Sequence, residues 1–462
     1  MEQQETVLGI DLGVTARSQI AVATGASIES SRSAASTPKG LTEGIARAAA
    51  GRRVAIVVES TAMAWLVAAV AAVRSGVDHT LYRISGSKAA ALRSFYRSHT
   101  KTDHIDARVL ARMPAVDDGL RSFQLPGSPE LALKRLVTGR HKLTSSSARL
   151  QNQLRSMLHW AAPGLIQAAG ATVSGGLLAV LGTWPDLSSL SRARTATVAR
   201  VGGWKPQRAE AVRQTAREAA DFYRGFVDFS DLGLEIELLI DQLELNQTQT
   251  CRIEQRIAQL HSRLYPADDL LSIPGVGPAV AGVVRAVVGN LERFANLASF
   301  RAYTGLVPRE DSSGEARRRG QISKAGPSVL RWALYLAADV ARQWDPQLAE
   351  LYRRLMVERG RTHTQAVCAV ASHLAGRIWA VVHENRAYQW RDLAGNPISR
   401  EQAHALAQSL RVDSETRARL RTARKQRGPD APCARQLEAP QDVIQPSAVD
   451  VTEMALEVAR KA

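Results

Sequence analysis

The sequence has 462 residues, of which 45% are hydrophobic, so the chain is long enough for two or three domains with cores of their own. Lys and Arg number 60 against 44 Asp and Glu, a net charge of +16 that favours a polyanionic partner, although an arginine-rich coding bias can contribute to it. The sequence shows no secretory signal and no uncharged apolar run of about 18 residues, and its three cysteines lack ligand spacing, which predicts a cytoplasmic protein without a membrane partner, disulfide framework or zinc site.

Residues 6–112 alternate between strand-like and helix-like segments. Three strands that can form a meander come first, and helices and strands then alternate, which is the order of an RNase H-like α/β domain with a mixed sheet covered by helices. We expect this domain to span residues 1–115. The expected strands are 7–11, 19–23, 27–33, 54–59 and 80–84, and the expected helices are 41–50, 62–74, 88–96 and 103–112.

The first strand ends in the stretch GIDLG, which places the carboxylate of Asp11 at the polar end of a buried segment. Sugar-kinase and actin-like ATPases and RNase H-like nucleases both begin this way, because the Asp lies beside a metal-phosphate site and Gly permits close approach. An Asp that closes an ordinary hairpin turn is a third interpretation. The ATPases also need a second phosphate loop in a duplicated domain, whereas helical patterns follow residue 112, and this difference favours the nuclease group.

Three further acids of this domain have positions that suit metal binding. Glu59 ends the strand in RVAIVVES, and Asp103 and Asp106 lie three residues apart at the start of a helix, so they project from one face. With Asp11 they would surround one or two divalent cations such as Mg2+, which can clamp the attacking and leaving oxygens of a phosphodiester. Each also has a structural interpretation, as helix N-terminal charges or as a solvated strand end.

Residues 128–267 carry the heptad pattern of two long helices, with a helical insertion at 165–230 between them. In each arm apolar residues recur every seven residues, and in the second arm another apolar residue follows each of them four residues later. Asn246 is the one polar residue at a heptad position of the second arm. Such arms can form a hairpin stalk, a coiled-coil contact between subunits, or the core of a helical bundle. The heptad positions are Leu136, Leu143, Leu150 and Met157 in the first arm, and Leu232, Ile236, Leu239, Leu243, Ile253, Ile257, Leu260 and Leu264 in the second.

A compact all-α module is expected at residues 268–385, and it begins with a glycine-containing turn. The stretch IPGVGPAVA has the pattern of a helix-hairpin-helix, in which Gly275 and Gly277 allow a tight turn whose amides can bind a nucleic-acid phosphate, although such hairpins also serve as plain helical corners. Residues 386–462 are expected to be helical at first and then to form a basic tail, disordered from Arg417 to Arg435.

The same module contains a polar loop within GLVPREDSSGEARRRGQISKAGPSVLR, with two serines among many cations. Neighbouring guanidinium groups can stabilise a serine alkoxide and the phosphorane that forms when it attacks a phosphodiester. The residues alone favour the simpler interpretation, a solvated loop whose cations bind backbone phosphates. The serines are Ser312 and Ser313, and the cations are Arg309, Arg317, Arg318, Arg319, Lys324 and Arg331.

Taken together and in this order, the motifs resemble those of the DEDD insertion-sequence transposases related to the Piv DNA invertase, which are bridge-RNA-guided serine recombinases. The resemblance rests on GIDLG, VVES, KTDHIDARVLAR, IPGVGPAVA, YTGLVPR followed by SG, and ISKAGPSVLRWAL, and covers roughly residues 5–112 and 268–385. The sequence departs from the family by its insertion at 165–230 and by ESTA, from Glu59 onward, where the family has E-A-T-G. Neither difference removes an acid or the serine.

The resemblance implies a RuvC-like domain, a coiled-coil linker and a C-terminal transposase domain with a nucleophilic serine. It also implies Mg2+ as cofactor, donor and target DNA and an element-encoded guide RNA as partners, and a homo-oligomer, dimer or tetramer, joined by the coiled coil. By position, the four acids correspond to Asp11, Glu59, Asp103 and Asp106, and the nucleophile to Ser313, directly before Gly314, with Ser312 as its nearest rival.

We therefore expect a site-specific DNA recombinase that excises and inserts a mobile element through a transient phosphoserine. The main alternative is a RuvC-like structure-specific endonuclease, which cuts DNA with metal-activated water and forms no covalent bond to it. A nucleic-acid-binding protein whose acids do not catalyse is the third interpretation.

Overall fold

The computed structural model describes residues 5–13, 17–60, 63–96, 103–117, 119–313 and 316–427. Within these ranges, the side chains of residues 87, 103, 310–313, 316–320, 414 and 424–427 lie outside the described part. The chain divides into two compact units, Met1–Ser128 and Pro129–Ala462, and each is described by itself.

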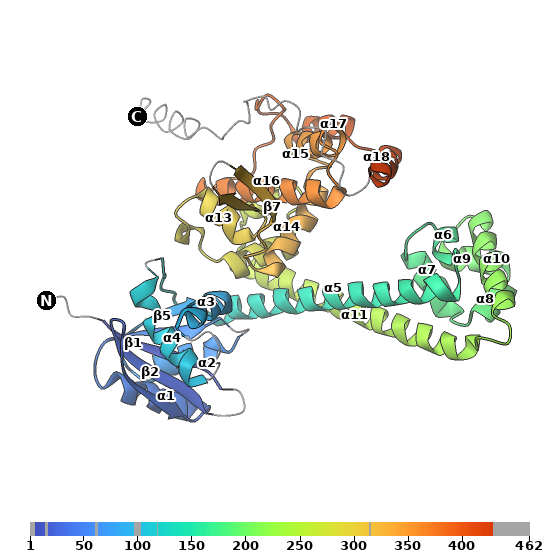
Figure 1. The fold of residues 1–462 in the computed structure, drawn as a ribbon. Coiled ribbons are helices and arrows are strands. Elements are labelled where there is room, and N and C mark those ends of the chain that lie inside the picture. The colour runs from blue at the N-terminus through green and yellow to red at the C-terminus, as the bar shows by residue number, and fades with distance from the viewer. Residues whose placement is uncertain are drawn as a thin grey trace. The chain divides into compact units, whose positions relative to one another are not determined.

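The N-terminal unit is built on a five-stranded mixed sheet with the strand order β3-β2-β1-β4-β5 (Figure 1). The central strand, β1, pairs antiparallel with β2 and parallel with β4. β1 and β4 are apolar and buried along their length until each reaches a half-buried acid at its last residue. The strands are β1 (Thr6–Asp11), β2 (Ser18–Thr24), β3 (Ser27–Ala34), β4 (Val54–Glu59) and β5 (His79–Ile84).

Helices cover both faces of this sheet. α4 (Asp103–Val116) packs on one face, where its apolar side chains share a core with Val7 of β1 and with alternate residues of β2 and β4. α1 (Pro38–Ala49) lies on the other face, next to Ile20, and contacts α2 (Trp65–Arg74). The remaining helix of the unit, α3 (Gly86–Tyr96), contacts α4. The expected mixed α/β domain is therefore confirmed.

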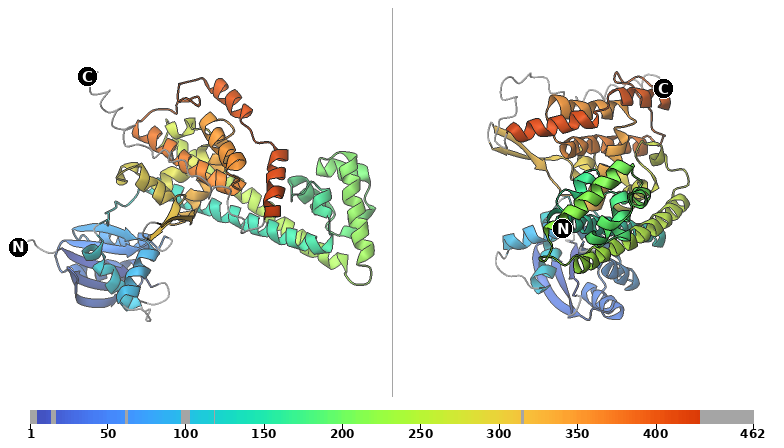
Figure 2. Two further views of the ribbon diagram at one scale, coloured as in Figure 1. Left: turned by 45° about the horizontal axis from the view of Figure 1, so that its top comes forward. Right: turned by 90° about the vertical axis from the view of Figure 1, so that its right-hand side faces the viewer.

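Two long helices of the second unit, α5 (Ser128–Ala161) and α11 (Phe229–Leu264), run side by side in opposite directions (Figure 1, Figure 2). Arg140 Nε of α5 donates a 2.6 Å hydrogen bond to Glu254 of α11, and Gly139 lies against Ile253. All heptad residues named above are buried or half-buried. The apolar seam is therefore occupied by packing within the chain.

The insertion forms a small helical domain at one end of this hairpin. Its helices share a core with Leu154 and Leu158 of α5 and with Leu232 and Ile236 of α11. Side-chain caps begin two of them: Ser174 accepts a hydrogen bond from Leu177 N, and Asp186 accepts one from Ser188 N. The helices are α6 (Leu165–Ala168), α7 (Gly175–Thr183), α8 (Leu187–Arg192), α9 (Thr195–Gly202) and α10 (Pro206–Phe222).

The C-terminal region is mainly helical, and its core includes Leu133 and Val137 of α5 and Ile257 and Leu260 of α11. A short 3-10 helix (Asp269–Ser272) leads into the glycine turn, and a π-helical turn (Val284–Val288) follows α12. The other helices are α12 (Pro278–Val283), the 3-10 turn Leu291–Arg293, α13 (Leu297–Thr304), α14 (Ser328–Ala341), α15 (Pro346–Arg353), the π-helical turn Arg354–Glu358, α16 (His363–His383), α17 (Arg400–Ser409) and α18 (Ser414–Arg427).

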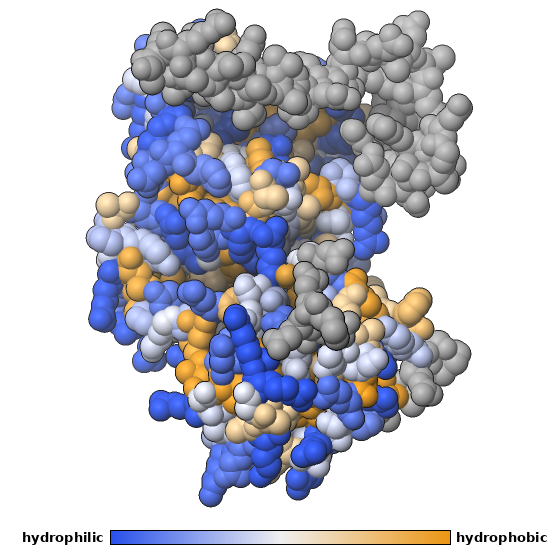
Figure 3. Space-filling model, turned by 90° about the vertical axis from the view of Figure 1, so that its left-hand side faces the viewer, coloured by the Kyte–Doolittle hydropathy of each residue, from blue (hydrophilic) through white to orange (hydrophobic). Residues whose placement is uncertain are grey.

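One described helix, α16, is long and apolar enough to cross a membrane by length and composition. Its buried residues, among them Val367, Val370, Leu374 and Ile378, belong to the C-terminal core. We therefore assign α16 as a helix of the C-terminal core. Figure 3 shows one face of the molecule on which hydrophilic residues predominate, with small apolar patches between them.

Two segments differ from the expectation. The polar loop around the serines contains a two-stranded antiparallel hairpin, β6 (Pro308–Ser313) and β7 (Ala316–Ile322), so the C-terminal region is not all-α. Its strands have polar or charged residues at most positions, and the alternation that predicts a strand is missing. The second segment is α18, which is helical from Ser414 to Arg427, where disorder was expected from Arg417. Residues 428–462 lie outside the described part.

Candidate active site

Asp11 and Glu59 lie at the ends of two neighbouring strands. β1 and β4 are parallel, with Ile10 opposite Val58, so the next residue of each strand occupies a matching position on the same face of the sheet. Neighbouring strands are about 4.8 Å apart. The Glu59 carboxylate also lies at the start of α3, where a Cβ atom at Gly86 would be 2.9 Å from Glu59 Oε1. The structure thus brings these two predicted acids together.

Gly9 allows helix α4 to pack on the same face of the sheet. A Cβ atom at Gly9 would lie 2.2 Å from both the carbonyl oxygen of Ala107 and the amide nitrogen of Ala111, so a larger residue would push the helix away. Asp11 is two residues further along β1 and therefore lies on the face that α4 covers. Asp106 directly precedes Ala107 in the helix.

Arg112 shows which end of α4 lies near Asp11. Arg112 Nε donates a 3.1 Å hydrogen bond to the carbonyl oxygen of Ala26, in the turn between β2 and β3. That turn lies at the start of β1, because Thr24 pairs with Thr6. The N-terminal part of α4, with Asp106, is therefore directed toward the other end of β1, where Asp11 lies.

Asp106 is held in an ion pair with Arg93 of α3. The Nη1 to Oδ1 distance is 2.5 Å, and the two side chains are only 18% and 13% exposed. Among the described side chains, no three acidic, His or Cys groups are close enough together to hold a metal ion, and the Asp103 side chain lies outside them. Sequence reasoning missed Arg93, because an arginine 13 residues before an acid carries no spacing signal.

Ser312 and Ser313 end strand β6, next to the turn of the hairpin. Ser313 pairs with Ala316 and Ser312 with Arg317, so the backbone places the first arginine of β7 directly opposite a serine. Arg318 and Arg319 follow along the same strand, opposite two acids of β6. The side chains of these hairpin residues lie outside the described part, and the two serines are distinguished here by position alone.

The base of the hairpin is fixed by close packing. A Cβ atom at Gly326 would lie 1.7 Å from a carbonyl oxygen of α13, and Arg331 Nη1 donates a 3.1 Å hydrogen bond to the Gly326 carbonyl. Arg309 Nη2 donates to the carbonyl of Ser323 at 3.3 Å. Lys324 is exposed and has a φ of 55°, which is strained for a residue other than glycine. These cations therefore lie where the hairpin joins the helical core.

The two glycines of the predicted helix-hairpin-helix have different environments. Gly275 has a φ of +79°, and a Cβ atom there would lie 2.2 Å from the carbonyl oxygen of Ala337 in α14. The turn shape and its packing on α14 therefore both require this glycine. Gly277 is exposed, has open space where a Cβ would lie, and directly precedes α12. Of the two, Gly277 is thus the one whose backbone faces solvent.

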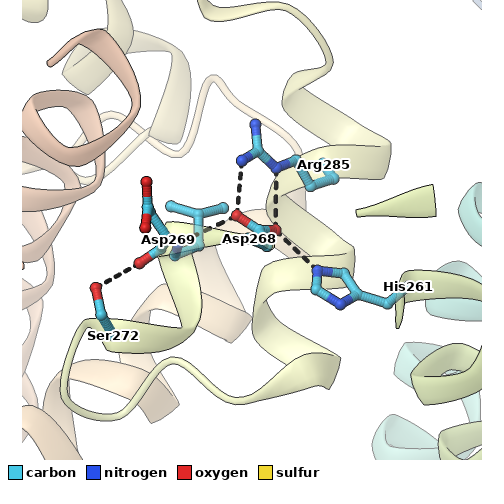
Figure 4. Close-up of polar contacts among 6 residues, drawn as sticks. His261, Asp268, Asp269, Ser272 and Arg285 are labelled. Carbon is cyan, nitrogen blue, oxygen red and sulfur yellow. Dashed lines mark hydrogen bonds and ion pairs between the residues drawn. The ribbon is translucent and has the colours of Figure 1, made fainter. Parts of the chain in front are cut away.

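A buried group of polar residues, the Asp268 cluster (His261, Asp268 and Arg285), connects α11 to this turn (Figure 4). Asp268 Oδ2 is 2.9 Å from His261 Nε2, and Asp268 Oδ1 is 2.6 Å from Arg285 Nη2. Burial opposes ionisation of Asp268, but hydrogen bonds from His261 and Arg285 outweigh it and hold the pKa of this carboxyl well below its usual range. Sequence reasoning missed this cluster, because its residues follow no motif.

We expect Asp268→Ala to lower the free energy of unfolding by about 3–5 kcal/mol, because it leaves the Arg285 cation partly buried without its partner. Urea denaturation of both proteins measures the difference, and Asp269→Ala, whose side chain is not part of the cluster, is the matched control. Since the folded-state pKa of Asp268 is lowered, its stabilisation is present at neutral pH and is lost as the pH falls below about 4. A difference that stays constant from neutral pH to pH ~3 would contradict this assignment.

Comparison with known families identifies both regions that carry the predicted site. A family model described as "Transposase IS116/IS110/IS902 family" matches residues 267–353. A second model, for DEDD transposases of the IS110 type, matches residues 8–163. Asp11, Glu59, Asp106 and the serine hairpin lie within these matches, whereas residues 164–266 lie outside both.

Curated relatives carry matching descriptions. An insertion element IS110 protein of 43.6 kDa from Streptomyces coelicolor is 27% identical over 330 residues, which cover 68% of this chain and 81% of the relative. An insertion element IS116 protein from Streptomyces clavuligerus is 26% identical over 67% of this chain and 76% of its own length. A pilin gene-inverting protein of Moraxella lacunata is 27% identical over 28% of this chain and 40% of its own length.

Proposed function

Since this chain belongs to the IS116/IS110/IS902 family of transposases, we propose that it is a site-specific recombinase that cuts and rejoins DNA at the ends of a mobile element. The observation that carries the proposal is the arrangement of the acids. Asp11 and Glu59 occupy matching positions on parallel strands, and the start of α4, with Asp106, is directed toward the same end of the sheet. The protein would act in the cytoplasm, on the chromosome.

The acids suit Mg2+, which prefers carboxylate oxygens. Asp11 and Glu59 would hold the ion first, and Asp103 and Asp106 would complete the site from α4. Arg93 holds the Asp106 side chain in place, and Asp106 would exchange this ion pair for metal coordination when DNA is bound. A bound magnesium ion would neutralise charge that develops on the phosphoryl oxygens.

Ser313 is the proposed nucleophile. Its hydroxyl oxygen would attack a DNA phosphorus, so that one phosphodiester P–O bond breaks as a serine phosphoester forms and the leaving DNA oxygen takes up a proton. A DNA hydroxyl from the second site would then reverse the step and release the serine. Because the phosphoester is kept, strands can be rejoined without an external energy source. The resemblance of the motif order favours Ser313 over Ser312.

The cations around the hairpin would hold the DNA backbone during this exchange. Arg309, Lys324 and Arg331 lie at its base, and the arginines of β7 follow the serine strand. The exposed backbone at Gly277 would add an amide contact to phosphate. Contacts of this kind position DNA without reading its sequence, so we further propose that a guide RNA encoded by the element selects donor and target.

The acids and the serine belong to separate compact units, and we propose that they meet between subunits. The heptad residues of α5 and α11 are already packed within the chain. A second apolar stripe remains on α11, where Leu234, Leu238 and Leu245 are 55%, 51% and 56% exposed. Their spacing of four and seven residues places them on one side of the helix, which would pair the subunits through a coiled coil.

Trapping of the covalent intermediate tests the proposed function. The protein is incubated with DNA of the element ends and Mg2+, and we expect a species of slowed mobility on a denaturing gel. Ser313→Ala should remove it, and Ser312→Ala, which changes a neighbouring hydroxyl in the same strand, should leave it in place. Metal-dependent cutting that survives Ser313→Ala would instead establish the endonuclease that uses activated water.

A further inference from the structure

The insertion, residues 165–230, is a separate feature of this chain. Its helices form their own core at the end of the α5–α11 hairpin, and residues 164–266 lie outside both family matches. The strand-cutting residues proposed above lie elsewhere. The insertion therefore needs a role of its own.

Aromatic rings are exposed where α10 ends and α11 begins. Phe222 is 75% exposed, Phe226 is 87% exposed and Trp160 at the end of α5 is 48% exposed. Tyr223 holds two of them in place: its ring centroid is 4.8 Å from that of Phe222 and 6.5 Å from that of Trp160, and its hydroxyl donates a 2.6 Å hydrogen bond to the Trp160 carbonyl. Exposed aromatic side chains gathered at one place indicate a binding surface.

A groove of about 660 Å³, here called the tip groove, lies between α8 and α10, and Phe226 is one of the residues that line it. Its two acids are already engaged: Asp221 pairs with Arg224, and Asp228 accepts the amide hydrogen of Ser230 to cap α11. The charged and aromatic residues that line it are Arg192, Arg217, Asp221, Arg224, Phe226, Asp228 and Phe229.

Two arginines give the tip groove its charge. Arg192 and Arg217 are exposed, and neither forms an ion pair within the described part of the chain. Both line the tip groove, because α8, which carries Arg192, packs on α10, which carries Arg217. Unpaired guanidinium groups next to exposed aromatic rings match a ligand that has both anionic and flat apolar groups. Nucleotides have this combination, with phosphates for the arginines and bases for the rings.

We propose that the tip groove binds an unpaired stretch of nucleic acid, with bases stacked on Phe222 and Phe226 and phosphates held by Arg192 and Arg217. Double-stranded DNA would bind less well, because its bases are already stacked and cannot reach the rings. The inference rests on the proposed function only in that the chain handles nucleic acid. A loop of RNA and a displaced DNA strand share this chemistry.

Binding of short oligonucleotides to the full-length protein tests the proposal. Fluorescence anisotropy is measured with labelled oligouridine RNA and oligothymidine DNA of about 12 nucleotides, and with a duplex of equal length. Phe222→Ala and Phe226→Ala should each weaken single-strand binding by roughly tenfold and duplex binding little. Arg192→Gln with Arg217→Gln should also reduce the salt dependence of binding. Tighter binding of one single strand identifies RNA or DNA as the source.

The controls separate this site from other cationic surfaces. Val340→Ala and Leu393→Ala change exposed apolar residues of the C-terminal region, outside the insertion, and they should bind as the wild type does. Photo-crosslinking of an iodouridine probe, followed by trypsin digestion, should label the peptides that contain Phe222 and Phe226, which lie on separate fragments because trypsin cleaves after Arg217 and Arg224. The variants should melt as the wild type does, since the rings are exposed.

Unchanged single-strand affinity in both phenylalanine variants would overturn the proposal, and so would crosslinks confined to other peptides. Loss of binding to anionic lipid vesicles without loss of oligonucleotide binding would assign the rings to a membrane surface instead. None of these measurements requires DNA cleavage. If the proposed recombinase function is wrong, the wild-type protein will not cut DNA. The oligonucleotide-binding measurements would still test the tip groove.

Discussion

Asp11→Asn and Glu59→Gln should each reduce cutting of element-end DNA by roughly a thousandfold or more, because a metal-held phosphoryl group contributes several kcal/mol to transition-state stabilisation. Both substitutions keep the size of the side chain, and both acids are half-buried at strand ends, so the fold should persist. DNA affinity should change little, since the cations proposed to hold the backbone belong to the other unit. Cleavage rates and gel-shift affinities measure the two effects.

Asp78→Asn is the matched control for these variants. Asp78 is an exposed acid of the same unit that pairs with Arg53, and it lies just before β5, at the opposite end of the parallel strands from Asp11. This variant should cut at the wild-type rate. Normal cutting by Asp11→Asn would show that the acids are not catalytic, and loss of the folded state in a thermal melt would assign them a structural role.

A mixture of two inactive variants should regain activity. Asp11→Asn and Ser313→Ala are each expected to be inactive alone, but a mixed dimer contains one site with both native groups if the serine of one subunit meets the acids of its partner. Mixing equal amounts should restore about a quarter of wild-type cutting, since about half of the dimers are mixed and each has one intact site of two. Cleavage by the mixture is compared with that of each variant alone.

Leu238→Lys introduced into both proteins is the control for this mixture. It places a charge in the exposed stripe of α11, so it should prevent pairing and abolish the recovery. An inactive mixture that is shown by native mass spectrometry to contain mixed dimers would place the acids and the serine of one site in the same chain.

Much of the N-terminal unit could be predicted from the sequence. Apolar strands that end in Asp11 and Glu59 indicate two buried, parallel strands, because strands covered on both faces must be apolar on both faces. Their matching ends follow from strand order alone. The family resemblance was also recognisable, because its motifs occur in order across both units, and the family matches confirm it.

Contacts between distant residues could not be predicted in the same way. Gly9 is required by the backbone of α4, about a hundred residues later, and nothing near Gly9 in the sequence indicates this. Arg93 and the Asp268 cluster depend on which helices meet, which single-sequence patterns do not encode. The hairpin at Ser313 was missed because charged strands lack apolar alternation.

The α5–α11 hairpin shows a further limit. Its heptads predicted long helices, but equally allowed contact within a chain or between subunits. The structure buries them within the chain and leaves Leu234 and Leu238 exposed on another side of α11. The insertion connects the end of α5 to the start of α11, and it lets α11 run back along α5 within the same chain. Periodicity describes one helix at a time, and so it could not decide the partner.

The residue that carries DNA after cleavage can be identified directly. The trapped complex is digested with nuclease and trypsin, and the peptide EDSSGEAR, released by cleavage after Arg309 and Arg317, is fragmented in the mass spectrometer. We expect a nucleotide attached through phosphate to Ser313, and none when Asp11→Asn protein is used alone. A nucleotide on Ser312 or on another residue, or cleaved DNA with no modified peptide, would contradict this expectation.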